Sequence, residues 1–258
     1  MASVDPDWWK RVFDETYLIT DARSVCDDQV TRMEVNFLEK ALQPEKSWPI
    51  LDFCGGHGRH ALEFARRGYG DVTVLDYSDV LIALGRRAAE KQGLSTRFVK
   101  EDARNTSLPE EAFKVVLVMA SSFGYFLDES ENGKILREAY RLLKPEGRLL
   151  LDLPNREYVI LNFSTQSWHE AESGIVVCRQ RRLEGDVIYC REIVLCRKKG
   201  ELRDEHYCTR LYSEDNIKAM LYSAGFSSVT TQENFVSHQK EGDYGCMTNR
   251  MIAIATKE

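Results

Sequence analysis

Three aspartates, each at the end of a short apolar stretch, have the residue type and spacing best suited to chemistry in this sequence. Asp52 follows the run 49–51, and three glycines come within the four residues 55–58. A glycine-rich bend lets the backbone approach a ligand without a side chain in between. The helical pattern at 61–67 would present unpaired N–H groups and positive partial charge to that ligand. The stretch predicts a strand, a binding turn and a helix, although a purely structural turn fits the same residues.

Asp76 and Asp102 repeat this arrangement after the next two apolar stretches. Asp76 lies 18 residues beyond Gly58, and an acid at about this separation can accept hydrogen bonds from both hydroxyls of a ribose. The carboxyl ends of parallel strands meet at one edge of a sheet, where doubly wound folds bind adenosine-type cofactors. The glycines do not follow the G-x-G-x-x-G spacing used for a dinucleotide pyrophosphate, which disfavours a nicotinamide cofactor.

Together these strand ends resemble the motifs of the class I S-adenosylmethionine-dependent methyltransferases, over residues 48–155 and less closely over residues 224–258. The resemblance implies S-adenosylmethionine as the cofactor, with Asp76 at its ribose and Asp102 beside its adenine. Cys54 departs from the family, which usually has glycine there, and His57 stands where a small polar residue is usual. The cofactor-binding residues that the resemblance implies are Asp52, Cys54, Gly55, Gly56, Gly58, Asp76, Tyr77, Asp102, Ala103, Ala120 and Ser121.

Two features near the N-terminus add to this candidate site. Trp9, Phe13 and Tyr17 recur at helical spacing and predict a helix. In the family such helices often form a lid over the cofactor, where aromatic rings attract a sulfonium by cation–π interaction; a helix simply packed on the core fits the same stripe. Arg23 or Arg32 could bind the cofactor's carboxylate, although a solvated arginine is equally consistent. We therefore include Tyr17 and Arg23 among the candidate cofactor-binding residues.

The whole pattern predicts an α/β protein with a Rossmann-like, doubly wound, seven-stranded sheet in a single methyltransferase domain. Its expected parts are an N-terminal helical lid at 1–47, a cofactor-binding core at 48–155, an inserted antiparallel sheet at 164–212, and a last helix with a C-terminal hairpin at 213–258. Within the insertion, residues with the period of strands predict three strands, at 175–183, 187–197 and 205–212. We interpret this sheet as a cover for the substrate or as the interface of a homodimer.

Composition restricts the function further. The net charge of −6 gives no overall electrostatic footprint for nucleic acid. Seven cysteines without a C-x-x-C pair argue against a zinc site and a disulfide framework, and they suit a reducing cytosol. No apolar run approaches the roughly 18–20 residues that span a bilayer, and the N-terminus lacks the pattern of a signal peptide. We therefore expect a cytoplasmic protein with no metal and no membrane or nucleic-acid partner.

The methyl acceptor is less well defined by the sequence. The loop at 121–128 would face the transferable methyl in the family, and it lacks the Asn/Asp-Pro-Pro-Tyr/Phe motif usual in enzymes that methylate amino groups of nucleic acids or of protein glutamine. The sequence is therefore interpreted as a methyltransferase for an N or O nucleophile of a small molecule. The alternatives are a macromolecular substrate such as transfer RNA or protein, a nicotinamide-dependent oxidoreductase, and a non-catalytic binding module.

A hydroxyl acceptor would need a general base, whereas a neutral amine would not. His238, in the long loop at 237–245, is the first candidate for that base, and His206, on a strand of the inserted sheet, is the second. Tyr125, in the loop expected to face the methyl, is a third candidate catalytic residue. Exposed or structural roles fit these three side chains as well.

Overall fold

A seven-stranded sheet organises the chain, of which the computed structural model describes residues 4–171, 174–238 and 244–258. Its strands, in the order β10-β11-β5-β4-β1-β2-β3, are β1 (Ile50–Phe53), β2 (Val72–Asp76), β3 (Thr96–Lys100), β4 (Phe113–Val118), β5 (Leu143–Pro154), β10 (Ser228–Phe235) and β11 (Arg250–Thr256). Neighbouring strands run parallel except where β11 pairs antiparallel with β5 and β10. The predicted doubly wound sheet is confirmed.

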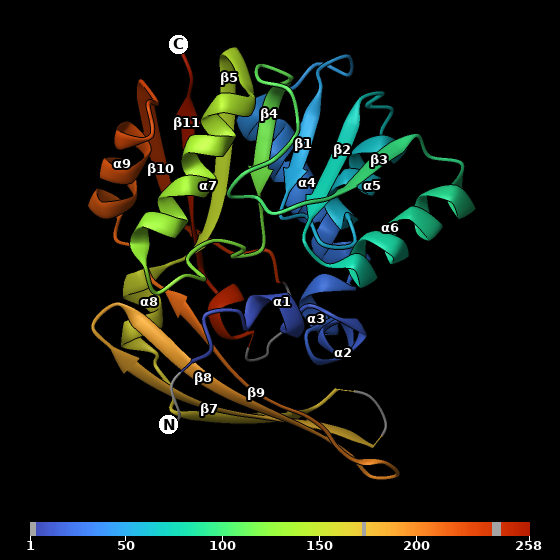
Figure 1. The fold of residues 1–258 in the computed structure, drawn as a ribbon, viewed down its shortest axis with the longest axis vertical. Helices are drawn as coiled ribbons and strands as arrows, with labels where there is room; N and C mark the ends of the chain where they lie inside the picture. The colour runs from blue at the N-terminus through green and yellow to red at the C-terminus, as the bar shows by residue number, and fades with distance from the viewer. Residues whose placement is uncertain (1–3, 172–173, 239–243) are drawn as a thin grey trace.

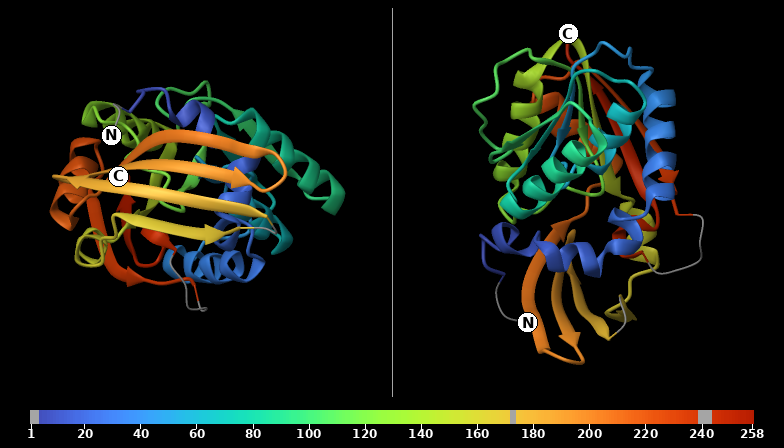
Figure 2. Two further views of the ribbon diagram at one scale, coloured as in Figure 1. Left: turned by 90° about the horizontal axis from the view of Figure 1, so that it is seen from below. Right: turned by 90° about the vertical axis from the view of Figure 1, so that its right-hand side faces the viewer.

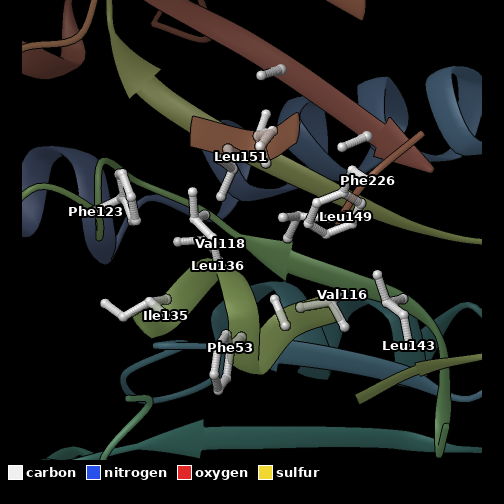
Figure 3. Packing of buried hydrophobic residues seen from close by; sticks show 14 of the residues in the cluster. Phe53, Val116, Val118, Phe123, Ile135, Leu136, Leu143, Leu149, Leu151 and Phe226 are labelled. Carbon is white, nitrogen blue, oxygen red and sulfur yellow. The ribbon is translucent and has the colours of Figure 1, made fainter. Parts of the chain in front are cut away.

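Helices cover both faces of this sheet (Figure 1). One face is covered by α4 (Asp28–Leu42), α5 (Arg59–Arg66) and α6 (Asp79–Gln92), and the other by α7 (Glu129–Leu142) and α9 (Glu214–Ser223). Figure 3 shows the second face, where Ile135 and Leu136 of α7 pack against side chains of the central strands. The strands between the two helical layers are buried on both sides, as their nearly continuous apolar runs require.

A second, four-stranded antiparallel sheet lies apart from the first (Figures 1 and 2). Its strands pair in sequence order: β6 (Gln166–Glu170), β7 (Ile175–Glu184), β8 (Val187–Cys196) and β9 (Gly200–Arg210). The short helix α8 (Arg156–Leu161) connects it to β5. The three expected strands are present, and β6 is an additional edge strand. Its sequence of mostly polar residues around Trp168 lacks the apolar alternation of a half-buried strand, which is why the pattern did not indicate it.

Three short helices lie between the two sheets (Figures 1 and 2): α1 (Trp9–Val12), α2 (Glu15–Thr20) and α3 (Ala22–Val25). A continuous helix through Trp9 and Tyr17 was expected, and the chain instead breaks at Phe13 and Asp14. The Asp14 carboxylate accepts hydrogen bonds from the N–H groups of Thr16 and Tyr17, at 2.8 and 3.1 Å, and so caps α2. The cap redirects the chain but keeps the aromatic side chains on the side of the large sheet.

A short 3-10 helix, η1 (Gly245–Met247), precedes β11 on the side of the three N-terminal helices. The predicted hairpin of β10 and β11 is present. Part of the long loop between its strands, residues 239–243, lies outside the described residues. Among the helices of the described chain, none combines the length and the apolar character that crossing a membrane requires.

Candidate active site

The three predicted acids lie around one cavity. Asp52 is the penultimate residue of β1, Asp76 is the last residue of β2, and Asp102 lies two residues after β3; all three line a hollow of about 950 Å³, counted with its open mouth. The cavity lies at the carboxyl ends of the parallel strands, where the strand order reverses between β1 and β4, which is the position at which doubly wound folds bind ligands. Other predicted residues that line it are Tyr17, Cys54, Gly55, Gly56, Tyr77, Ala103, Ala120 and Tyr125.

The turn after β1 has a strained backbone. Cys54 takes a left-handed conformation with φ of 60°, in which glycine is favoured, and this explains why glycine is usual at that position. Gly58, with φ of 76°, does not line the cavity. A Cβ at Gly58 would lie 2.8 Å from Val74 and 2.9 Å from Phe98. Gly58 is therefore needed for packing the turn against the strands, whereas Gly55 and Gly56 border the cavity.

Asp76 holds the turn and faces the cavity. One of its carboxylate oxygens accepts a hydrogen bond from the Gly56 N–H at 2.8 Å, and the other accepts one from the Ser78 N–H at 2.9 Å. Burial raises the pKa of Asp76. Each carboxylate oxygen can accept a second hydrogen bond, so both remain available to a pair of hydroxyl donors in the cavity.

Two buried polar atoms at this cavity have no partner among the described residues. Asp52 accepts a hydrogen bond from the Ala61 N–H through Oδ2, at 3.3 Å, but its Oδ1 has none. Arg59, only 8% exposed, donates from Nη1 to Thr31 and Glu34, while its Nη2 has none. Buried polar groups are normally satisfied. An unsatisfied acceptor and an unsatisfied donor in one cavity suit the ammonium and the carboxylate of an amino-acid group.

Arg59 was not among the predicted site residues. Its signal in the sequence was its place directly after the glycine turn, at the first position of α5. Arg23 and Arg32 had been considered for the same carboxylate. Neither borders this cavity: the guanidinium of Arg23 lies over the ring of Tyr244 at 5.5 Å, and Arg32 is exposed on α4.

Asp102 faces an aromatic end of the cavity. Burial alone would raise the pKa of Asp102, but Arg104 donates hydrogen bonds to both of its oxygens and holds the pKa below its usual value. The guanidinium of Arg104 lies over the rings of Trp9 and Phe126, at 5.0 and 4.6 Å. Trp9 meets Tyr77 edge-on at 4.6 Å and Phe126 edge-on at 5.6 Å, and these three rings form an aromatic slot that suits a purine ring.

A second cavity of about 1000 Å³ adjoins the first and lies between the N-terminal helices and the four-stranded sheet. The residues that border both cavities are Phe13, Tyr17, Val25, Ala120 and Tyr125. Phe13 stacks on Tyr125 with ring centres 5.5 Å apart and meets Tyr17 edge-on at 5.2 Å. Burial raises the pKa of both tyrosines, so their hydroxyls stay neutral near pH 7 and act as hydrogen-bond donors.

The histidines lie outside the second cavity as far as the structure describes its lining. His57 borders the first cavity, where burial and the nearby Arg59 lower its pKa to about 4. His238 makes a hydrogen bond to the Ser24 hydroxyl at 3.0 Å and stacks on Tyr244, with ring centres 3.8 Å apart. Burial lowers the pKa of His238 to about 4. It therefore sits beside the site, and its role as a base stays a prediction.

His206 also borders neither cavity. It pairs across the sheet with Arg191, and its neighbour Tyr207, on the opposite face of β9, is the residue that borders the second cavity. Tyr125 borders both cavities. Ser121, predicted to bind the cofactor, borders only the second cavity.

A buried network of ion pairs contacts residues that border both cavities. It consists of Glu34, Arg59, His60, Asp152 and Arg250. Arg250 donates to Glu34 at 2.5 Å and pairs with Asp152, and all three side chains are fully buried. His60 contacts the second Glu34 oxygen at 2.9 Å, beside Arg59. Burial raises the pKa of Glu34, but Arg59, Arg250 and His60 outweigh it and hold the pKa well below its usual value.

Asp152 connects this network to the loop after β4. Its carboxylate accepts a hydrogen bond from the Ala120 N–H at 2.8 Å, and its backbone oxygen accepts one from the Ser121 N–H at 3.2 Å. Ala120 and Ser121 both have left-handed backbone conformations, with φ of 56° and 58°. Such conformations persist where the surroundings fix them. The network therefore fixes the loop that separates the two cavities.

Comparison with known proteins places this arrangement in a family. Residues 50–147 match the family described as "Methyltransferase domain". The chain is 25% identical over 238 residues to a glycine/sarcosine N-methyltransferase of Halorhodospira halochloris, covering 90% of this chain and 83% of that protein. It is 33% identical over 127 residues to a ubiquinone/menaquinone biosynthesis C-methyltransferase of Bartonella quintana, covering 47% of each. The chain thus spans about half the length of the quinone-biosynthesis relatives that it matches.

Solved structures share the fold. A methyltransferase of Streptomyces caelestis superposes with a TM-score of 0.71 at 19% identity, covering 89% of this chain and 96% of that one. An amino pentose methyltransferase of Micromonospora echinaspora, solved with S-adenosylmethionine bound, gives a TM-score of 0.63 at 18% identity over 88% and 90% of the two chains. Residues 50–147 thus match a methyltransferase domain, and the chain has the fold of the class I S-adenosylmethionine-dependent methyltransferase family. S-Adenosylmethionine, the cofactor expected from the sequence, is the cofactor of this family.

Proposed function

We propose that this protein transfers a methyl group from S-adenosylmethionine to a nitrogen atom of a small molecule. The observation that carries the proposal is the second cavity, which adjoins the acid-lined cavity through Phe13, Tyr17 and Tyr125. A cavity of this size beside the cofactor site suits a small acceptor better than a folded macromolecule. The net charge of −6 also gives no general attraction for nucleic acid.

The first cavity fits the cofactor along its length. The aromatic slot of Trp9, Tyr77 and Phe126 would take the adenine, and Asp76 would accept the ribose hydroxyls. Asp52 and Arg59 would bind the ammonium and the carboxylate, which satisfies the two polar atoms that have no partner among the described residues. The cofactor supplies a methyl group already activated by positive sulfur, so the protein's contribution is mainly alignment of the nucleophile.

Nitrogen is favoured over oxygen by the lack of a free base in the described lining of the second cavity. Its two carboxylates, Asp21 and Glu192, both pair with Arg179, at 2.9 and 2.7 Å. A neutral amine can attack with its lone pair, forming the C–N bond while the C–S bond breaks and its electron pair stays on sulfur. The amine then gives its proton to solvent. A hydroxyl would have to lose its proton first.

The relatives support the proposal in different degrees. The glycine/sarcosine N-methyltransferase matches over most of both chains, whereas the quinone C-methyltransferases match over about half.

All seven cysteines are free thiols, which supports a cytoplasmic location. The outer face of the four-stranded sheet exposes Trp168 to 73%; a homodimer through this sheet stays a prediction.

Cofactor affinity should depend on pH through Asp52. Burial, with Asp76 and Glu34 nearby, raises the pKa of Asp52 to about 7, although the Ala61 N–H and Arg59 oppose the rise. A bound ammonium favours the ionised carboxylate, so binding below pH 7 must expel a proton. The affinity for S-adenosylhomocysteine should therefore rise by up to about tenfold per pH unit from pH 5.5 and level off near pH 7. Calorimetry across this range measures it.

Asp52→Asn is the control for this pH dependence, because the amide cannot titrate. Its affinity should be lower and flat between pH 5.5 and 7. A wild-type affinity that stays constant over the same range would remove Asp52 from the cofactor's ammonium.

Binding and transfer together test the proposed function. Calorimetry should show saturable binding of S-adenosylmethionine and S-adenosylhomocysteine and no binding of nicotinamide dinucleotides. Incubation with methyl-labelled cofactor and a fractionated cell extract should place the label in the low-molecular-mass fraction, on nitrogen. Label in protein or transfer RNA, or binding of the dinucleotide instead, would contradict the proposal.

A further inference from the structure

One charged side chain of the second cavity has no counter-charge. Asp21, Arg179, Arg181 and Glu192 border this cavity. Arg179 bridges the two carboxylates, at 2.9 Å from Asp21 and 2.7 Å from Glu192. The guanidinium of Arg181 forms no ion pair with any residue that the structure describes, although Arg181 is only partly exposed.

Each neighbouring carboxylate already has a guanidinium partner without Arg181. Glu192 also pairs with Arg203 at 3.3 Å, and Arg203 pairs with Asp14. The three carboxylates therefore share two guanidiniums in a continuous chain from Asp14 to Asp21. Taking a charge partly out of water without a partner is unfavourable, so Arg181 is a binding group that the described protein leaves unused.

The register of the sheet shows what lies beside Arg181. Arg181 pairs with Cys190 of β8, and Cys190 pairs with Tyr207 of β9. All three border the cavity, so a cation, a thiol and a hydroxyl form one row across the floor of the second cavity. Neighbouring strands are about 4.8 Å apart, so Arg181 lies about two strand spacings from the hydroxyl-bearing strand. The Arg181 side chain also reaches Gly245, with Nη2 3.9 Å from where a Cβ would stand.

We propose that Arg181 binds a carboxylate of the methyl acceptor, so that the acceptors are small amines that also carry a carboxylate. This inference rests on the proposed function, because it takes the second cavity as the acceptor chamber. A guanidinium presents two parallel N–H groups that match a carboxylate. A single negative charge is favoured over a phosphate dianion because Asp21 and Glu192 border the same cavity and would repel a second charge.

The proposed orientation follows from the two ends of the cavity. With its carboxylate at Arg181, the acceptor would extend toward Phe13, Tyr17 and Tyr125, where the two cavities meet. The neutral hydroxyls of Tyr17 and Tyr125 can orient the amine there without removing its proton. Arg181 would thus select the acceptor, and the aromatic boundary would present its nitrogen to the methyl.

The test compares Arg181→Gln with Arg182→Gln. Arg182 is the next residue of β7, is exposed, points to the other face and pairs with Glu184 at 3.0 Å. The probes are amino acids and their neutral amides: sarcosine and sarcosinamide, β-alanine and β-alaninamide, 4-aminobenzoate and 4-aminobenzamide, phenylalanine and phenylalaninamide. Methyl transfer is followed with labelled cofactor, and S-adenosylhomocysteine binding is measured for each variant.

Wild type should use at least one acid at least tenfold better than its amide, as expected for a charge-assisted pair. Arg181→Gln should lower kcat/KM for that acid about 10- to 100-fold, mainly through KM, and leave the amide unchanged. Arg182→Gln should behave as wild type. Both variants should bind S-adenosylhomocysteine like wild type.

The failures are distinguishable. If the wild-type protein does not bind S-adenosylhomocysteine, the proposed function itself is contradicted. Intact cofactor binding with equal use of acids and amides, with no acid accepted, or with an acid preference that survives Arg181→Gln would overturn only the role of Arg181. An Arg181-dependent preference for O-phosphoethanolamine over the carboxylates would assign the cavity to phosphorylated amines and also overturn the carboxylate proposal.

Discussion

Replacing Arg250 by methionine should lower the free energy of unfolding by about 3–5 kcal/mol, the typical loss when one partner of a buried ion pair is removed. Arg250 is fully buried and is shared by Glu34 and Asp152. Without it, the only hydrogen bond that the Asp152 carboxylate keeps among the described residues is the one from the Ala120 N–H, whereas Glu34 keeps Arg59 and His60. Urea denaturation followed by circular dichroism measures the change.

Arg87→Met is the matched control, because Arg87 is exposed on α6 and forms no ion pair with the described residues. Its effect should stay within about 0.5 kcal/mol. Arg250→Lys should fall between the two, because an ammonium on a flexible stem cannot reproduce the guanidinium's fork to two carboxylates. A loss below about 1 kcal/mol for Arg250→Met would show that the network contributes little to folding.

Asp76→Ala should weaken S-adenosylhomocysteine binding by about 1.5–3 kcal/mol, or roughly 10- to 150-fold. The variant loses the proposed bonds to both ribose hydroxyls, and it also frees the N–H groups of Gly56 and Ser78 that now hold the turn. Calorimetry at pH 7.5 gives the affinity directly.

Two further variants separate the ribose from the turn. Asp71→Ala removes an exposed acid just before the other end of β2 and should leave the affinity unchanged. Asp76→Asn keeps a side-chain oxygen for the turn and should lose less than Asp76→Ala. An affinity for Asp76→Ala equal to that of wild type would remove Asp76 from the site.

Local signals in the sequence were enough to predict the large sheet and the meeting of Asp52, Asp76 and Asp102 at one cavity. Each acid lies within two residues of the carboxyl end of its strand, and parallel strands bring their carboxyl ends together whatever the details of packing. Capping is equally local: Ser78 and Ser213 cap α6 and α9 by accepting hydrogen bonds from N–H groups three residues further on.

Arg59, Arg181 and Arg250 could not be assigned in the same way, because their roles depend on partners far along the chain. Arg250 meets Glu34 across 216 residues, and Arg59 meets it across 25. Arg181 is distinguished from its neighbour Arg179 only by what each one pairs with in three dimensions. The break between α1 and α2 was missed for a smaller reason, since Asp14 caps one helix within a stripe that reads as continuous.

The two cavities are lined largely by different parts of the chain. Among the described residues that border the second cavity, only Ala120, Ser121 and Tyr125 lie in the stretch 50–147 that matches the family, and the rest come from the N-terminal helices, the four-stranded sheet and η1. With the second cavity as the proposed acceptor site, substitutions in the four-stranded sheet and η1 would change which molecule is modified without altering any described residue that borders the first cavity. Specificity for the acceptor can therefore diverge while the residues around the first cavity stay unchanged.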